Sequence, residues 1–99
     1  MTINTERKDA AVTLRISGRL DTTTAPELET AVNAIPSDVK DLTLDMAEVT
    51  YISSAGLRVL LGAQKKMSRI GSMKLTGVCE AVMGVLEITG FADIPPIEQ

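Results

Sequence analysis

The hydrophobic residues of this 99-residue chain alternate between two spacings, and this alternation limits the folds open to it. Residues 11–17 and 41–46 carry an apolar side chain at every second position, which indicates half-buried strands. Residues 54–70 carry one at every third or fourth position, which is typical of an amphipathic helix. Because strands and helices follow one another along the chain, we expect parallel strand pairs joined by helical crossovers.

The remaining segments extend this order. The polar pair Lys8-Asp9 separates residues 3–7 from residues 11–17, which predicts an opening antiparallel hairpin. Thr24, followed by Glu27 three residues on, predicts a capping box at the start of a first helix that ends before Pro36. The further predicted elements are a helix from Ser54 closed by Gly71, a strand over residues 73–78, a helix containing Val82, Val85, Leu86 and Thr89 and closed by Gly90, and an edge strand or tail over residues 94–97.

These elements predict an α/β fold class. We expect a small mixed β-sheet, with an opening antiparallel hairpin followed by parallel strands, and with helices packed on it. The length of the chain is close to the common size of one domain, so residues 1–99 are interpreted as a single domain.

The composition excludes several classes of function. Aromatic residues make up only 2% of the chain, so platforms for stacking nucleic-acid bases are absent. The net charge of −3 disfavours direct binding to nucleic acid or to anionic membranes. Histidine is missing, which removes Ser-His-Asp and Cys-His catalysis and most zinc sites. No P-loop motif is present, and we expect no enzymatic activity, no cofactor and no metal site.

The sequence also bears on the compartment. Cys79 is the single cysteine, which favours a reducing environment. No apolar run follows a basic start, and no apolar run approaches the ~18 residues of a membrane span. We expect a cytoplasmic protein that makes no membrane contact.

Charge is distributed unevenly along the chain. No Asp or Glu occurs between Glu48 and Glu80, and the basic residues of this stretch are Arg58, Lys65, Lys66, Arg69 and Lys74. A solvated helix face is the commoner explanation of such a run. The more specific explanation is a docking surface for an acidic partner or a phosphate.

The junction between the strand at 41–46 and the helix from Ser54 is the most informative segment. Sites in open α/β sheets cluster beyond the carboxyl ends of strands, and a helix N-terminus favours an anion. Ser53 and Ser54 lie at this junction, where a serine N-cap contributes about 1 kcal/mol over alanine. Asp21 and Asp45 are either a carboxylate pair near the serines or residues that satisfy the N–H groups of their own turns.

Four stretches resemble one family. Asp45 through Leu61 resembles the signature of STAS domains, especially bacterial anti-sigma factor antagonists. Gly18-Arg19-Leu20-Asp21 with Thr24 and Leu28, Leu42-Thr43-Leu44-Asp45, and Leu86 through Phe91 resemble the family's first helix entry, central strand and last helix. The resemblance covers nearly the whole chain in order.

This resemblance implies a function. In the family, a serine two residues before the helix glycine is phosphorylated, and that position is Ser54 here. Ser53 stands where the commonest motif has an acid and is a secondary candidate, while Ala55 stands where it has a second hydroxyl residue. The implied partners are an anti-sigma factor that is also a serine kinase with a histidine-kinase-like ATPase fold, and a metal-dependent serine phosphatase that reverses the modification.

We expect one region of the chain to bind the partner, and we name it the docking surface. Its members are Asp21, Thr22, Ser53, Ser54, Ala55, Gly56, Arg58, Lys65 and Arg69. Two alternatives stay open at this point. One is a STAS binding subunit of a transporter or signalling assembly that is not phosphorylated. The other is a small nucleotide hydrolase, which the missing histidine and P-loop disfavour.

Overall fold

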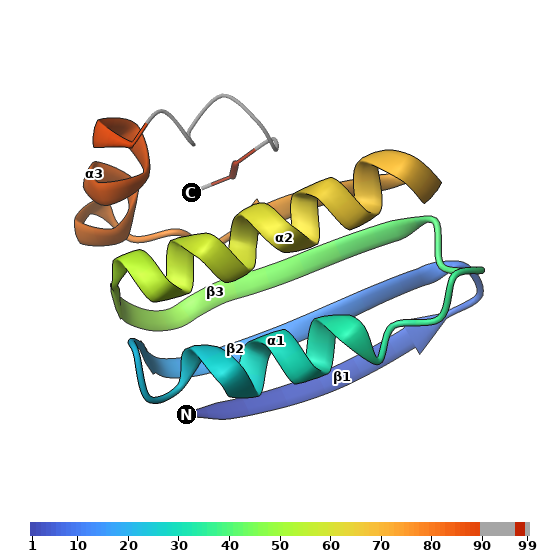
Figure 1. Cartoon of the computed structure of the whole chain (residues 1–99), viewed down its shortest axis with the longest axis horizontal. Helices are drawn as coiled ribbons and strands as arrows, with labels where there is room; N and C mark the ends of the chain where they lie inside the picture. Colours follow the sequence, from blue (N-terminus) through green and yellow to red (C-terminus); the bar gives the residue numbers. More distant parts are fainter. Residues whose placement is uncertain (90–96, 99) are drawn as a thin grey trace.

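The computed structural model describes residues 1–89, 97 and 98, and Figure 1 shows the chain. Its elements follow the predicted order. They are β1 (Thr2–Lys8), β2 (Ala11–Leu20), α1 (Ala25–Asn33), β3 (Asp41–Ile52), α2 (Ser54–Ile70), β4 (Ser72–Thr76) and α3 (Glu80–Ile88).

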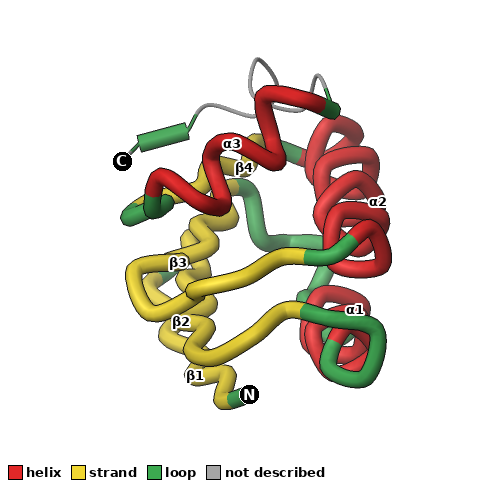
Figure 2. The backbone as a smooth tube through the Cα atoms, turned by 90° about the vertical axis from the view of Figure 1, so that its left-hand side faces the viewer, coloured by secondary structure: helices red, strands yellow, loops and turns green. Residues whose placement is uncertain are grey.

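The strands form one mixed sheet in the order β1-β2-β3-β4. β1 pairs with β2 in the antiparallel sense, and β2–β3 and β3–β4 are parallel pairs, which confirms the predicted fold class. Figure 2 shows α1 and α2 on one face of this sheet. α3 packs against β3 and lies at the end of the sheet where α2 begins (Figure 1).

The core between the sheet and the helices is aliphatic, as the low aromatic content predicts. The buried side chains of the two central strands include Val12, Leu14, Ile16, Leu42, Leu44 and Met46. They belong to one cluster with Leu28 of α1 and with Leu60 and Met67 of α2. Burying each such side chain contributes about 1.5–3 kcal/mol, so this layer holds both helices in place.

β3 is longer than the alternation predicts, because it runs to Ile52 rather than to Met46. Its register with β2 slips: Arg15 lies opposite Asp45, but Ser17 lies opposite Glu48, and a second shift follows Gly18. Each slip gives β3 an extra residue, as in a β-bulge, and turns two successive side chains outward. The bulges therefore interrupt the period-two pattern without ending the strand.

α2 ends at Gly71, as predicted, but for a different reason. The φ angle of Gly71 is 177°, which is extended backbone and not the left-handed conformation of a C′ glycine. A Cβ at this position would collide with the carbonyl group of Lys40. The Ser72 N–H donates to that same carbonyl at 2.7 Å. Glycine thus permits a close backbone approach here.

The last predicted segments are described in part. β4 covers residues 72–76 instead of 73–78. Ile97 forms a parallel bridge with Leu75, which agrees with a final edge segment. Gly90, Phe91 and residues 94–96 lie outside the described residues. Within residues 1–89, no helix is both long and apolar enough to cross a membrane.

Candidate functional site

The start of α2 lies where two parallel strands end. α2 follows β3 with only Ser53 between them, and the Ser53 N–H donates to the carbonyl of Leu20 at the end of β2 at 2.9 Å. This is the carboxyl edge of the parallel strands, where sites of α/β sheets are usual. The geometry brings the Ser53-Ser54 segment next to the turn that begins at Asp21.

Gly56 allows this close packing. It is buried, and a Cβ on it would lie 2.7 Å from Cγ of Leu20 and 3.0 Å from Cγ1 of Ile52. The first turn of α2 therefore rests directly on the last residues of β2 and β3. Any larger side chain would require the start of the helix, Leu20 or Ile52 to shift.

The two serines have different roles. Ser53 is the N-cap residue of α2, and its hydroxyl accepts a hydrogen bond from the Gly56 N–H at 3.3 Å. Ser54 is the first residue of the helix, and its side chain is exposed. Among residues 1–89, 97 and 98, no group is hydrogen-bonded to the Ser54 hydroxyl. One serine thus supplies the cap, and the other presents a hydroxyl to solvent.

The turn before α1 is closed on itself. Oδ1 of Asp21 accepts from the Thr23 hydroxyl at 2.8 Å and from the N–H groups of Thr23 and Thr24 at 3.0 and 3.1 Å. The Thr23 hydroxyl, followed by the Thr24 N–H, holds the pKa of Asp21 below its ordinary value, because both stabilise the charged carboxylate.

The predicted capping box at Thr24 is wrong. The Thr24 hydroxyl makes no capping bond, since it donates to the carbonyl of Arg19 at 2.7 Å and accepts from the Asp21 N–H at 2.8 Å. Its backbone is already helical, with φ −98° and ψ −20°, whereas a capping residue is usually extended. The first N–H groups of α1 bond to backbone carbonyls instead, Ala25 to Asp21 at 2.8 Å and Glu27 to Thr24 at 2.9 Å.

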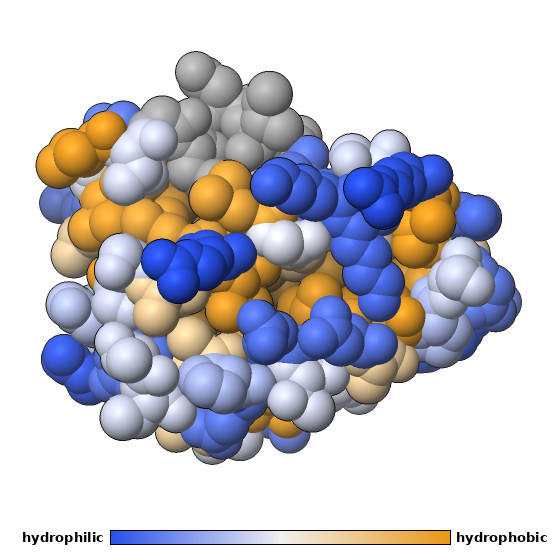
Figure 3. All heavy atoms as spheres, viewed as in Figure 1, coloured by the Kyte–Doolittle hydropathy of each residue, from blue (hydrophilic) through white to orange (hydrophobic). Residues whose placement is uncertain are grey.

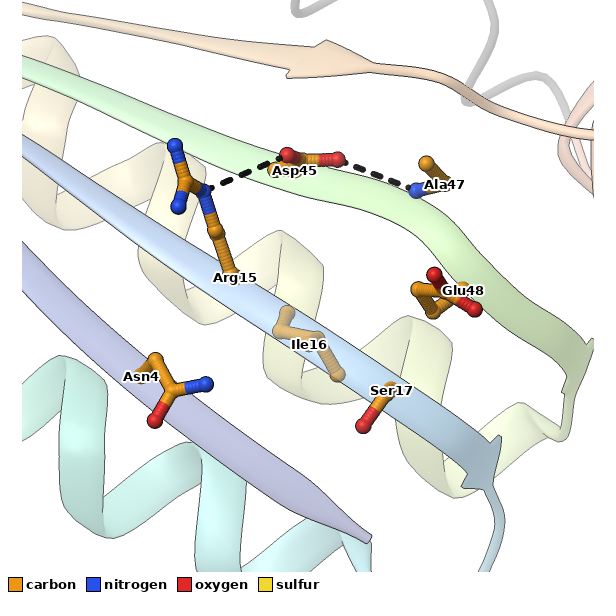
Figure 4. Close-up of a pocket in the computed structure, with 7 residues that line it drawn as sticks. All are labelled: Asn4, Arg15, Ile16, Ser17, Asp45, Ala47 and Glu48. Atoms are coloured by element: carbon orange, nitrogen blue, oxygen red, sulfur yellow. Dashed lines mark hydrogen bonds and ion pairs between the residues drawn. The ribbon is translucent and has the colours of Figure 1, made fainter.

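Asp45 does not form a carboxylate pair with Asp21. It lies in the first half of β3, where Oδ1 accepts from the Ala47 N–H at 3.1 Å and Oδ2 lies 3.7 Å from Nε of Arg15. Figure 4 shows Asp45 and Arg15 on the sheet with the helices behind it. Asp21 bonds to its own turn, which is the other of the two predicted roles, whereas Asp45 bonds to the Ala47 N–H inside β3, at the first bulge.

The same open face of the sheet carries a depression of ≈ 460 Å³. It is lined by Asn4, Arg15, Ile16, Ser17, Asp45, Ala47 and Glu48 (Figure 4). Arg15 also pairs with Glu6, at 3.0 Å, so its charge is already balanced by two carboxylates. The depression lies beside the first bulge of β3.

The five basic residues of the acid-free stretch divide among three places. Arg58, Lys65 and Arg69 are exposed along α2, and none forms an ion pair with a described residue. Lys66 instead donates to the carbonyls of Val32 and Ile35 at 2.9 and 2.8 Å, which caps the end of α1. Lys74 lies on β4, 3.6 Å from Glu98.

The face that carries α1 and α2 has a mixed surface. Figure 3 shows hydrophilic side chains along it with hydrophobic surface visible between them. Leu61 of α2 has an exposed fraction of 47%, Thr22 is exposed, and Ala55 is half-buried. Apolar contact area and exposed positive charge therefore lie on the same helix as Ser54.

Arg19 and Tyr51 also belong to this end of the sheet, although sequence reasoning did not single them out. They lie opposite each other in the β2–β3 register, and the Arg19 guanidinium sits 4.2 Å from the centre of the Tyr51 ring. Arg19 also approaches Asp21 at 3.8 Å. This pairing depends on the bulges of β3, so the alternation of apolar and polar residues in the sequence does not predict it.

Comparison with known proteins agrees with this architecture. The model of the STAS domain family matches residues 2–99. An anti-sigma-B factor antagonist of Listeria monocytogenes is 33% identical over 97 residues, which cover 94% of this chain and 83% of the relative. Another, from Staphylococcus aureus, is 27% identical and covers 100% of this chain and 94% of the relative.

Solved structures share the fold. That of an anti-sigma factor antagonist from Mycobacterium paratuberculosis matches with a TM-score of 0.88 and 26% identity, over 98% of this chain and 84% of the other. That of the Bacillus cell fate determinant SpoIIAA in its phosphorylated form matches with a TM-score of 0.70 and 17% identity, over 99% and 91%. The chain belongs to the STAS domain family, among the anti-sigma factor antagonists.

Proposed function

We propose that this chain is an anti-sigma factor antagonist switched by phosphorylation of Ser54. In the unphosphorylated form, the docking surface binds a serine-kinase anti-sigma factor with a histidine-kinase-like ATPase fold, in the cytoplasm. The kinase then transfers the γ-phosphoryl group of ATP to the Ser54 hydroxyl, ADP leaves, and the complex dissociates. A metal-dependent serine phosphatase restores the binding form. The chain itself is a binding partner and a substrate, not a catalyst.

The main support for this proposal is the exposed hydroxyl of Ser54 at the start of α2. Ser53 uses its hydroxyl to accept from the Gly56 N–H, whereas the Ser54 hydroxyl is exposed and has no hydrogen-bond partner among the described residues. A kinase can therefore reach Ser54 without breaking a cap. This difference favours Ser54 over Ser53 as the phosphorylated residue.

The charges of α2 support the binding half of the proposal. Arg58, Lys65 and Arg69 are exposed on the same helix as Ser54, and no Asp or Glu lies between Glu48 and Glu80. Such a surface attracts an acidic partner and speeds encounter. A phosphate adds about −1.5 to −2 charges at the edge of this surface, so it opposes the complementarity that formed the complex.

The relatives support the partner class. The Listeria and Staphylococcus proteins are named as anti-sigma-B factor antagonists, which implies an anti-sigma factor partner for them. The SpoIIAA structure is of a phosphorylated protein with the same fold. By extension, we assign to this chain an anti-sigma factor partner and a phosphorylated state.

The first test is phosphate mapping and binding with purified serine-kinase anti-sigma factors, taken one by one from the genome that encodes the chain. Ser54→Asp is expected to bind its kinase at least about tenfold more weakly than the wild type, equivalent to 1.4 kcal/mol, with an unchanged thermal midpoint. Mass spectrometry should find phosphate on Ser54. Ser54→Ala should bind without being modified, and Ser53→Ala should still be modified.

Ser37→Asp is the matched control. Ser37 is exposed in the link between α1 and β3, which contacts Lys66 in the second half of α2, so the substitution adds the same charge away from the first turn of α2. It should bind like the wild type. Phosphate on Ser53, or Ser54→Asp binding as tightly as the wild type, would overturn the switch. Binding without any phosphorylation would return the chain to the class of unmodified STAS binding subunits.

A further inference from the structure

Ser54 and Arg58 lie one helical turn apart on the solvent face of α2. Residues four apart on a helix are neighbours, and both side chains are exposed. The residues on either side of Arg58, Leu57 and Val59, are buried. The helix therefore presents Ser54 and Arg58 together to solvent at the end that meets the sheet.

Arg58 has no charged partner in the described part of the chain. Arg58 and Glu29 of α1 line the same groove of ≈ 120 Å³ between α1 and α2. The two nevertheless form no ion pair. An exposed side chain changes rotamer within picoseconds to nanoseconds, so Arg58 can turn toward Ser54 without losing an existing bond.

The surroundings of Ser54 favour an anion. The Gly56 N–H is already bonded to Ser53, but the N–H groups of Ser54 and Ala55 precede the first helical hydrogen bond. The first turn of α2 contains no acidic residue. Asp21, in the neighbouring turn, is engaged by Thr23 and Thr24.

Arginine and a phosphate monoester are well matched. The guanidinium presents its N–H groups as a planar fork, and a phosphate has three acceptor oxygens and about −1.5 to −2 charges. At a spacing of four residues the fork reaches across one turn. Lys65 lies eleven positions beyond Ser54, roughly 16 Å along the axis at 1.5 Å per residue, and cannot substitute for Arg58.

We infer that the phosphate on Ser54 is bound by Arg58 of the same chain. This inference rests on the proposed function, since it assumes that Ser54 carries the phosphate. It adds a second element to the switch. Phosphorylation introduces negative charge, and it also withdraws Arg58 from the docking surface. The partner loses one attractive contact at the moment it meets a repulsive one.

The test uses the full chain with phosphoserine placed at position 54 during translation, so it needs no kinase. The second ionisation of the phosphate is followed by ³¹P NMR over pH 4–8 in the otherwise unsubstituted chain and in Arg58→Gln, Arg58→Lys and Lys65→Gln. Because a bound guanidinium favours the dianion, Arg58→Gln should raise the phosphate pKa by about 0.3 pH units.

The other variants distinguish the effect of the planar guanidinium group from the effect of positive charge alone. Arg58→Lys keeps the charge without the planar fork and should give an intermediate pKa, whereas Lys65→Gln removes an equal charge from the same helix and should leave the pKa unchanged. In 1 M salt the difference between the chains should shrink, since the pair is exposed. Equal pKa values in Arg58→Gln and Lys65→Gln would overturn the inference.

The two proposals fail in different ways. If no kinase modifies Ser54 but Arg58→Gln shifts the phosphate pKa, the proposed function is wrong while the pairing of Arg58 with the phosphate stands. If kinases modify Ser54 and the pKa does not respond to Arg58, the switch operates without Arg58. Circular dichroism of each phosphorylated chain verifies that α2 is folded in the comparison.

Discussion

The two helices that follow the parallel strands β2 and β3 begin in contrasting ways. Before α1, the groups of the turn bond to one another: Asp21 accepts from Thr23 and Thr24, and the Thr24 hydroxyl donates to Arg19. Before α2, Ser53 makes a single capping bond, and the neighbouring hydroxyl of Ser54 is exposed without a described partner.

This difference separates scaffold from site. A network whose donors and acceptors are bonded to one another fixes a turn, but it leaves few hydrogen-bonding groups available to a partner. An exposed hydroxyl beside unused helix N–H groups can still form such bonds. We therefore interpret the α1 turn as the support that positions the edge of the sheet, and the first turn of α2 as the part that changes state.

The largest expected effect tests how closely α2 must approach the sheet. In Gly56→Ala, the new methyl group would meet Leu20 and Ile52 at 3.0 Å or less. Overpacking of this kind costs about 1–3 kcal/mol, and the better helix propensity of alanine offsets only part of it. Urea denaturation should show a lower free energy of unfolding. The rate at which the kinase phosphorylates Ser54 should also change, because the turn that carries Ser54 is displaced.

Gly62→Ala is the matched control for that substitution. Gly62 lies in the same helix, and a Cβ there would have no heavy atom within 4 Å. Alanine should stabilise α2 by about 0.5–1 kcal/mol, because glycine loses more backbone entropy. Equal effects at the two glycines would show that close packing on β2 and β3 does not define the start of α2.

A smaller effect on the free energy of unfolding is expected at the turn from Asp21 to Thr24, and this effect depends on pH. The pKa of Asp21 is lowered in the folded chain by its bonds to Thr23 and Thr24, so its contribution to stability is present above the unfolded value of about 3.9. It is lost as the pH falls through the lowered folded pKa. Asp21→Asn should flatten the stability curve below about pH 4.

Urea denaturation between pH 6 and pH 2.5 measures this slope. Asp38→Asn is the comparison variant, because the hydrogen bond from Arg7, at 2.8 Å, also lowers the pKa of Asp38. Each variant should remove part of the acid sensitivity, and the double variant should remove more. A wild-type slope in Asp21→Asn would contradict the view that this turn is held by the charged carboxylate.

The order of strands and helices could be predicted from the sequence because burial on one face sets the spacing of apolar residues. Residues 54–70 are the clearest case, since Leu57, Leu60, Ala63 and Met67 all face the core. The second half of β3 could not be predicted in this way. Bulges add residues to one strand, so alternation fails while pairing continues.

The site was predictable only in outline. The position of Ser54 at a strand-to-helix junction follows from local patterns, but the choice between two adjacent serines depends on which hydroxyl meets the Gly56 N–H. Lys66 and Lys74 look like members of one basic run, yet one caps α1 and the other lies on β4. Tertiary packing determines these roles, and the spacing of charges along the chain does not predict tertiary packing.

The smallest expected effect separates the two serines in the absence of any partner. Ser53→Ala removes the hydroxyl that caps α2, which typically costs about 0.5–2 kcal/mol, and the long 3.3 Å bond places it at the lower end. Ser54→Ala removes an exposed hydroxyl and adds a better helix former, so its effect should stay within about 0.5 kcal/mol. Paired urea denaturation curves at neutral pH measure both. A larger loss in Ser54→Ala would mean that Ser54 is the cap in solution. The free hydroxyl would then belong to Ser53, and the phosphorylation site that we assign would move with it.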